Sequence, residues 1–165
     1  MFVSSRRSAQ SEAKKLGQRM QKYLEKNNPE VLPQLRELSQ RLARSSNSAM
    51  GDTLAECVKG GVAFHHAGLM HAQRTEIENA FKNRLLYCLS ATPTLAAGVN
   101  LPARRVLIRD LKRFDDGMSR LLPVMEVKQM LGRAGRPRYD PVGEAWLACK
   151  GCLLYTSPSP RDTLL

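Results

Sequence analysis

Short runs of apolar residues separated by helical segments are the feature of this sequence that most constrains its fold. Residues 62–64, 85–89 and 106–108 are each apolar on both faces of an extended strand. Parallel sheets covered by helices produce such runs, whereas strands with one face in water alternate apolar and polar residues. Residues 71–82 predict a helix between the first two runs, and parallel strands need a crossover of that kind. The sequence therefore predicts an α/β fold with a mostly parallel sheet flanked by helices.

Three more helices are predicted in the N-terminal third of the chain. Apolar residues recur at three- and four-residue steps over residues 8–26, 33–44 and 53–59, which is the period of one helix face. The pair Gly60-Gly61 ends the third helix.

A β-hairpin is predicted after the third apolar run. Residues 111–124 alternate weakly around Asp115-Asp116-Gly117, a sequence suited to a tight turn. A short helix over residues 126–131 and a last strand over residues 144–149 follow it.

The two ends of the chain carry separate expectations. Phe2 and Val3 look like the end of a buried strand, and because two residues are too few for one, we expect the strand to have begun before Met1. Residues 151–165 have no apolar period and resemble translated vector or adapter DNA. We therefore expect an N-terminally truncated domain over residues 1–150 and a disordered, non-native tail over residues 151–165.

The charge of the chain indicates a polyanionic partner. There are 26 Lys and Arg residues against 15 Asp and Glu residues, a formal net charge of +11. A positive field attracts polyanions whatever fold carries it, so a non-catalytic basic module that binds nucleic acid by charge is one candidate function. Only 5% of the residues are aromatic, which favours contact with phosphates over stacking with bases.

The sequence has no apolar run long enough to span a membrane and no signal peptide at its start. We therefore expect a cytoplasmic protein, nuclear if the source is a eukaryote, with no membrane partner.

The cysteines offer a second candidate function. Cys149 and Cys152 form a C-x-x-C pair on which a thiol or zinc protein could be built, whereas Cys57 and Cys88 are isolated. A structural zinc site usually needs a second such pair or matched histidines, so we expect no metal.

Residues 129–137, with the sequence Gln-Met-Leu-Gly-Arg-Ala-Gly-Arg-Pro, form the most specific pattern in the chain. Two arginines three residues apart, each preceded by glycine, let two forked cations leave one side of a helix end. Arginine suits a polyphosphate because its guanidinium stays charged and can bond two phosphate oxygens at once.

This pattern resembles motif VI of the superfamily-2 helicases, and other segments extend the resemblance. Residues 91–103 look like motif V of the Ski-like branch, residues 2–7 resemble motif IV and residues 64–69 resemble motif IVa. The resemblance covers about residues 1–150 and favours the archaeal DNA helicases that act at stalled replication forks. An RNA helicase of the same branch is the alternative.

The resemblance implies the second RecA-like domain of an ATP-driven motor. In such motors a first RecA-like domain holds ATP with a Walker A loop and Mg²⁺ with an acidic motif. This sequence contains neither G-x-x-x-x-G-K-[ST] nor D-E-x-H, so we predict that the chain cannot hydrolyse ATP without that partner domain.

Five residues are matched to the nucleotide by the resemblance. Arg136 matches the arginine finger that stabilises the transferring γ-phosphoryl group, and Arg133 and Gln129 match its phosphate-contacting companions. Gly98 and Asn100 match positions in motif V that face the nucleotide, with Asn100 directed to the ribose.

Five other residues are matched to the tracked nucleic-acid strand. Ser5 and Arg6 in motif IV, and His66 and Gly68 in motif IVa, match positions that contact the backbone. Thr92 matches a hydroxyl that bonds a nucleic-acid phosphate.

The predicted hairpin lies where the resembled DNA helicases carry a strand-separating hairpin. Phe114 and Met118 would flank its tip and disturb base stacking at a fork, and an ordinary surface hairpin is the alternative. Arg104 and Arg105 are candidates for the same DNA track as Arg6. For the paired histidines, the alternative to phosphate contact is a strand end with a buried ring.

Overall fold

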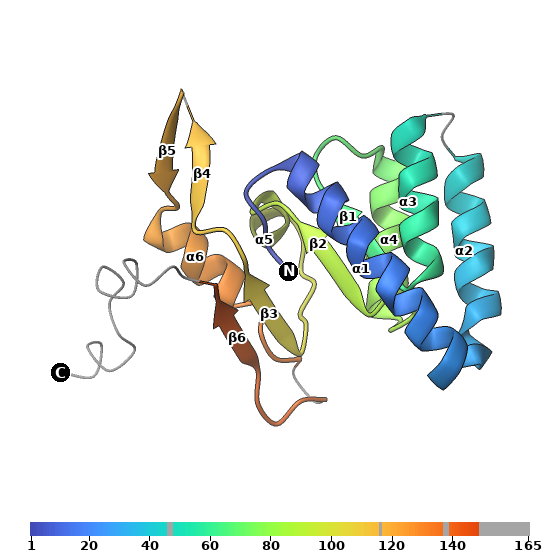
Figure 1. The fold of residues 1–165 in the computed structure, drawn as a ribbon. Coiled ribbons are helices and arrows are strands. Elements are labelled where there is room, and N and C mark those ends of the chain that lie inside the picture. The colour runs from blue at the N-terminus through green and yellow to red at the C-terminus, as the bar shows by residue number, and fades with distance from the viewer. Residues whose placement is uncertain (46–47, 116, 137–138, 149–165) are drawn as a thin grey trace.

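The computed structural model describes residues 1–45, 48–115, 117–136 and 139–148. In these ranges the elements up to Lys59 are all helices, and helices and strands alternate from there to Ile108 (Figure 1). In chain order the elements are α1 (Arg6–Asn27), the 3-10 helix η1 (Pro29–Val31), α2 (Leu32–Arg44), α3 (Ala49–Lys59), β1 (Val62–His65), α4 (His71–Lys82), β2 (Cys88–Ala91), α5 (Thr94–Gly98), β3 (Arg105–Ile108), β4 (Lys112–Asp115), β5 (Met118–Leu121), α6 (Val124–Leu131) and β6 (Glu144–Leu147).

The main sheet is parallel. Strand β1 pairs in parallel with β2, and β3 pairs in parallel with β6. Phe2 joins the two pairs, because it bridges Ala91 at the end of β2 and Ile108 at the end of β3, both in parallel. The first residues of the chain thus lie between β2 and β3, which fits the prediction that they belong to a strand and confirms the α/β fold.

Helix α1 covers one side of the sheet. Helix α1 packs against β1, β2 and α3, and α2 packs on α3 farther from the sheet (Figure 1). The apolar face predicted for α2 is buried, with Leu35, Leu38 and Leu42 each at most 1% exposed. Burial of such side chains is the main favourable term in the fold.

One close approach depends on glycine. A Cβ atom at Gly60 would lie 2.0 Å from the carbonyl oxygen of Gly17. Helix α1 can therefore pack tightly against the end of α3 only because Gly60 has no side chain.

Two apolar runs differ from their predictions. The strand predicted over residues 85–89 begins only at Cys88, because Arg84 adopts a left-handed conformation (φ 61°) and the N–H groups of Leu85 and Leu86 both donate to Ala80 O. These bonds close the end of α4 and delay the strand. Leu107 in β3 is 36% exposed, so the run 106–108 is not buried on both faces.

The remaining elements agree with the sequence more closely. Helix α4 has the predicted bounds, and β4 and β5 form the predicted antiparallel hairpin, in which Lys112 is opposite Leu121. Helix α3 begins four residues earlier than predicted, where the Ser48 side chain accepts a hydrogen bond from Gly51 N and caps the helix. None of the helices in the described ranges has the length and apolar character needed to cross a membrane.

Candidate functional site

A groove of about 540 Å³ collects several of the predicted site residues. It lies where the chain leaves the carboxyl ends of neighbouring parallel strands, a common place for ligands in α/β sheets. We call it the strand groove; its lining residues include Ser4, Ser5, Arg6, Ala67, Thr92, Arg113, Glu126 and Gln129.

Ser5 and Arg6 stand at the start of the longest helix. Ser5 is the N-cap of α1, and its hydroxyl accepts a hydrogen bond from Ser8 N at 3.1 Å. Arg6 is the first helical residue and is exposed. The N-terminal end of a helix carries partial positive charge, so this end of α1 offers both a dipole and a guanidinium to an anion.

Asp110 holds the preceding loop in place. Its Oδ2 accepts hydrogen bonds from Ser4 N at 2.9 Å and from Ser4 Oγ at 3.1 Å. Arg109 donates two bonds to the same carboxylate, at 2.9 and 2.8 Å, and also pairs with Glu12 of α1 at 2.9 Å. Burial opposes ionisation of Asp110, but the bonds from Arg109 and Ser4 outweigh it and lower its pKa below the ordinary value.

Sequence reasoning did not single out Asp110. Its partner Ser4 is 106 residues away along the chain. The two meet only because Phe2 lies beside the end of β3. The one available signal was its position just after the apolar run 106–108, next to Arg109.

His66 is buried rather than presented to the groove. Its side chain is 1% exposed and stacks on Phe64, with ring centroids 5.5 Å apart. Gly68 N donates to Nδ1 at 3.1 Å, and the Gln10 side chain lies 3.1 Å from Nε2. The resemblance matched His66 to a position that contacts the nucleic-acid backbone. The ring cannot make such a contact in this structure, because it is buried and both ring nitrogens already have partners. Burial and then the charge of Arg6 lower the pKa of His66.

Gly68 remains beside the groove. It is exposed, and a Cβ atom there would lie 3.0 Å from the ring of His66 and 3.5 Å from a guanidinium nitrogen of Arg6. The buried imidazole therefore fixes the backbone of Gly68 next to Arg6. His66 thus affects the strand groove through the position of Gly68.

Thr92 and Gln129 face the groove from two other elements. Thr92 follows β2, is 8% exposed, and shares a hydrogen bond of 2.9 Å with the hydroxyl of Thr94. Gln129 is exposed on α6, one helical turn before Arg133. Gln129 thus lines the strand groove, although the resemblance matched it to the nucleotide.

Arg133 connects motif V to motif VI. Its guanidinium donates to Asn100 Oδ1 at 3.1 Å through Nη1 and to Ala96 O through Nε and Nη2, the former at 3.1 Å. Gly98, the last residue of α5, is exposed between these two partners in the chain. The structure therefore brings together Arg133 and Asn100, two of the residues that the resemblance matched to the nucleotide.

Arg136 is held by a carboxylate. Its Nε and Nη2 donate to the two oxygens of Asp140 at 2.7 and 2.8 Å, and its backbone N–H donates to Oδ2 at 3.1 Å. The Asp140 side chain is 6% exposed, and the hydrogen bonds from Arg136 lower its pKa. The turn depends on Gly135, whose φ of 89° is a conformation that other residues rarely adopt.

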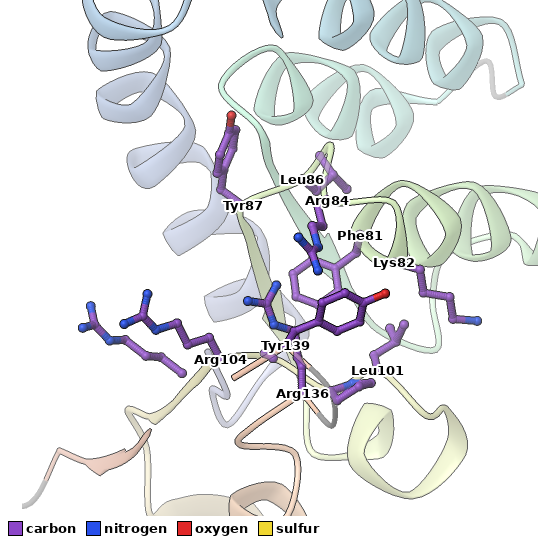
Figure 2. A pocket seen from close by; sticks show the side chains of 12 residues that line it. Phe81, Lys82, Arg84, Leu86, Tyr87, Leu101, Arg104, Arg136 and Tyr139 are labelled. Atoms are coloured by element: carbon purple, nitrogen blue, oxygen red, sulfur yellow. The ribbon is translucent and has the colours of Figure 1, made fainter. Parts of the chain in front are cut away.

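A second cavity, of about 620 Å³, lies beside Arg136. Figure 2 shows Arg136, Tyr139 and Arg84 in the middle of its lining, with Lys82 to one side and Arg104 to the other. Arg105 also lines it, and neither Arg104 nor Arg105 lines the strand groove. The expectation that they share one track with Arg6 is therefore wrong, because they precede β3 whereas the strand groove lies beyond the carboxyl ends of the strands.

The hairpin exposes apolar side chains next to the strand groove. Phe114 is 77% exposed and Met118 is 54% exposed. Arg113 of β4 forms an ion pair with Glu126 of α6 at 3.0 Å, and both residues line the groove. Asp116 at the predicted tip lies outside the described residues, as do Cys149, Cys152 and the tail from residue 151.

Comparison with known families places residues 40–138 in one of them. That segment matches the model of the helicase conserved C-terminal domain. It contains α4, the strands from β1 to β5 and the whole of motifs V and VI up to Arg136.

Comparison with curated proteins finds relatives along nearly the whole chain. The chain is similar to proteins named ATP-dependent DNA helicase Hel308 from three archaea. It is 48% identical to that of Methanocella arvoryzae over 151 residues, 91% of this chain and 20% of the relative. For Pyrococcus horikoshii the identity is 44% over 146 residues (88% and 19%), and for Thermoplasma volcanium 45% over 143 residues (87% and 19%). The chain thus spans about a fifth of the length of the curated relatives it matches.

Proposed function

Because the chain belongs to the family of helicase conserved C-terminal domains, we propose that it is the second RecA-like domain of an ATP-dependent DNA helicase. In this role it grips one strand by its backbone and supplies an arginine finger to ATP held by a first RecA-like domain. The observation that carries the proposal is helix α6, which bears Gln129 in the strand groove and leads directly to Arg133 and Arg136.

The arginine pair fits a polyphosphate. Arg133 is oriented by Ala96 and Asn100, and Arg136 by Asp140, so both forks are fixed in direction. When bound, ATP supplies the phosphoryl group that is transferred to water. Arg136 would then turn from the oxygens of Asp140 to those of the γ-phosphate, and fingers of this kind raise rates by about 10³–10⁵ in comparable enzymes. Mg²⁺ is expected on the acidic motif of the first domain.

The strand groove fits a nucleic-acid backbone. Ser5, Arg6 and Thr92 present two hydroxyls and one guanidinium to the same groove, and the exposed backbone of Gly68 lies beside Arg6. Contacts of this type fix the register of a strand without reading its sequence. A motor that moves along any sequence needs that property.

The geometry also couples the two ligands. Arg133 contacts Ala96 and Asn100 on either side of Gly98, while Thr92 and Ala97 line the groove from the same stretch of chain. Closure of the first domain on ATP would therefore pull on a segment that also touches the strand. The exposed Phe114 on the neighbouring hairpin would separate bases as the strand advances.

The archaeal relatives are named as DNA helicases, which favours DNA over RNA as the substrate. A role in the repair of replication forks is proposed from the resemblance of the motifs alone. A basic module without catalysis is the competing function, favoured only by the net charge of +11.

The test uses a chimera in which this chain replaces the matched segment of the Methanocella arvoryzae relative. We expect DNA-stimulated ATP hydrolysis, and we expect Arg136→Ala to lower its maximal rate by about 10³-fold or more. Arg136→Lys keeps the charge and loses the fork, so it should restore only part of the rate. Unwinding of DNA and RNA duplexes in parallel identifies the substrate.

Arg44→Ala is the matched control, because Arg44 is exposed at the end of α2 and lines neither cavity. The proposal is wrong if Arg136→Ala hydrolyses ATP at the rate of the Arg44→Ala control. A chimera that binds DNA but never hydrolyses ATP, while the parent relative does so, would support the non-catalytic module instead.

A further inference from the structure

The cavity beside Arg136 has an unusual concentration of positive charge. Among the described residues, its lining contains basic side chains and no acidic one. We call it the basic cavity; its basic lining residues are Lys82, Arg84, Arg104, Arg105 and Arg136.

Only part of this charge is neutralised. Arg105 pairs with Glu144 at 2.8 Å and Arg136 pairs with Asp140 at 2.7 Å. Lys82, Arg84 and Arg104 form no ion pair within the part of the chain that the structure describes. Besides the hydrogen bonds from their paired arginines, the charge of Arg104 lowers the pKa of Asp140 and Glu144, so these carboxylates offset part of it, whereas Lys82 and Arg84 have no such partner among the described residues. Cations around one cavity repel each other unless an anion lies between them.

Arg84 is held in an uncommon conformation that directs it to the cavity. Its φ is 61°, which is rare for a residue other than glycine. Its guanidinium lies over the ring of Tyr139, 4.2 Å from the ring centroid. This stacking fixes the plane of the guanidinium and leaves its edge free to donate hydrogen bonds.

The basic cavity lies at the opposite end of the strands from the strand groove. Tyr87 precedes β2 and Arg104 precedes β3, whereas Thr92 follows β2 and Asp110, which holds Ser4, follows β3. The two cavities have no lining residue in common.

We propose that the basic cavity is a second binding site for a nucleic-acid backbone, one that holds a strand other than the strand in the groove. The proposal rests on the proposed function, because a helicase handles two strands at once. Lys82 and Arg104 lie on opposite sides of Arg84 and Arg136 (Figure 2), so a backbone lying along the cavity meets a row of cations. Tyr87 is 45% exposed at its rim and offers an aromatic ring to a base.

The test measures how tightly the 165-residue chain binds labelled single-stranded and duplex DNA across a range of salt concentrations. The variant Lys82→Gln/Arg104→Gln removes two exposed cations that form no ion pair in the described structure. For single strands each phosphate contact contributes a salt slope of about 0.7, so the double variant should weaken binding about 25-fold at 0.1 M salt and reduce the slope by about 1.4.

Two further variants distinguish binding in the basic cavity from a general effect of net charge and from binding in the strand groove. Lys22→Gln/Arg44→Gln makes the same change in charge on exposed helical residues that line neither cavity. Arg6→Gln removes the cation of the strand groove. Thermal unfolding of each variant verifies that it is folded.

The outcomes are distinct. Loss of affinity in the cavity variant beyond that of the Lys22→Gln/Arg44→Gln control supports the second site. Loss in Arg6→Gln alone overturns the second site and leaves the proposed function intact, whereas loss in neither overturns both. If the cavity variant instead loses affinity only for Mg²⁺-ATP or inorganic tripolyphosphate, measured by calorimetry, the cavity serves a nucleotide and the proposal is overturned.

Discussion

Asp110→Asn tests whether a residue distant in the sequence holds the loop at Ser4, which lines the strand groove. The substitution keeps the shape of the side chain and one oxygen acceptor for Ser4. It removes the charge that Arg109 pairs with, and Arg109 in turn links this carboxylate to Glu12 of α1. The perturbation is therefore confined to the contacts between the loop, β3 and α1.

The magnitude follows from the bonds that are lost. Asp110 accepts two bonds from Ser4 and two from Arg109, and its side chain is 23% exposed. Hydrogen bonds to charged groups contribute about 1.5–3 kcal/mol, so loss of the fork from Arg109 should cost an amount in that range. For a domain of this size the melting temperature should fall by about 3–12 °C.

The assay combines thermal unfolding with DNA binding. We expect Asp110→Asn to melt earlier and to bind single-stranded DNA more weakly, because Ser5 and Arg6 follow the loop that it releases. Glu25→Gln is the control, since Glu25 is an exposed carboxylate on α1 that accepts only from Gln21 in the described structure. Equal melting temperatures of the two variants would refute the reasoning.

The same carboxylate predicts a response to acid. The pKa of Asp110 is lower in the folded chain than its ordinary value of 3.8. Its contribution to stability is therefore complete above about pH 3.8 and is lost as the pH falls through the folded pKa. In Asp110→Asn this loss should be absent, so the melting curves of the two proteins should converge in acid.

Three other perturbations have expected outcomes. Gly60→Ala places a Cβ atom 2.0 Å from Gly17 O, so the free energy of unfolding should fall by at least the ~1–3 kcal/mol typical of overpacking, as measured in urea; an unchanged midpoint would contradict the packing of α1 on α3. Burial lowers the pKa of His66 below 6.5, so stability should fall as the pH drops below about 6.5, and His66→Gln should lose this dependence in melts between pH 7.5 and 5.5. Phe114 is 77% exposed, so Phe114→Ala in the chimera should leave the melting temperature unchanged. It should slow unwinding by about fivefold to a hundredfold, the effect expected from the loss of one base–aromatic stack. Equal unwinding rates would show that the hairpin is an ordinary surface element.

Local patterns in the sequence were sufficient to predict an element where the residues of that element alone determine its structure. Helix α4 has the predicted bounds because its apolar period and its flanking residues agree. The strand predicted over residues 85–89 failed because an apolar run does not reveal that Arg84 turns the chain in a left-handed conformation. Chain reversals of this kind depend on backbone geometry, which the hydrophobic pattern does not record.

The site shows the same limit at longer range. The pairing of Arg133 with Asn100 follows from two recognisable motifs, so the sequence could anticipate that they belong to one site. The contact of Asp110 with Ser4 depends on which strands are neighbours, and no local pattern carries that information. Arg104 is separated from Arg6 because Arg104 precedes a strand whereas Arg6 follows one. His66 belongs to a motif that suggested contact with phosphate, yet its stacking on Phe64 buries it.

The central claim is that one domain binds the strand and the nucleotide through separate residues joined by α5 and α6. In the chimera, the rate of ATP hydrolysis as a function of DNA concentration tests it most directly. Arg6→Gln should raise the DNA concentration for half-maximal stimulation about fivefold at 0.1 M salt and leave the maximal rate unchanged. Arg136→Ala should lower the maximal rate about 10³-fold or more and leave that DNA concentration unchanged. If both variants change the same parameter, the assignment of separate strand and nucleotide sites is contradicted.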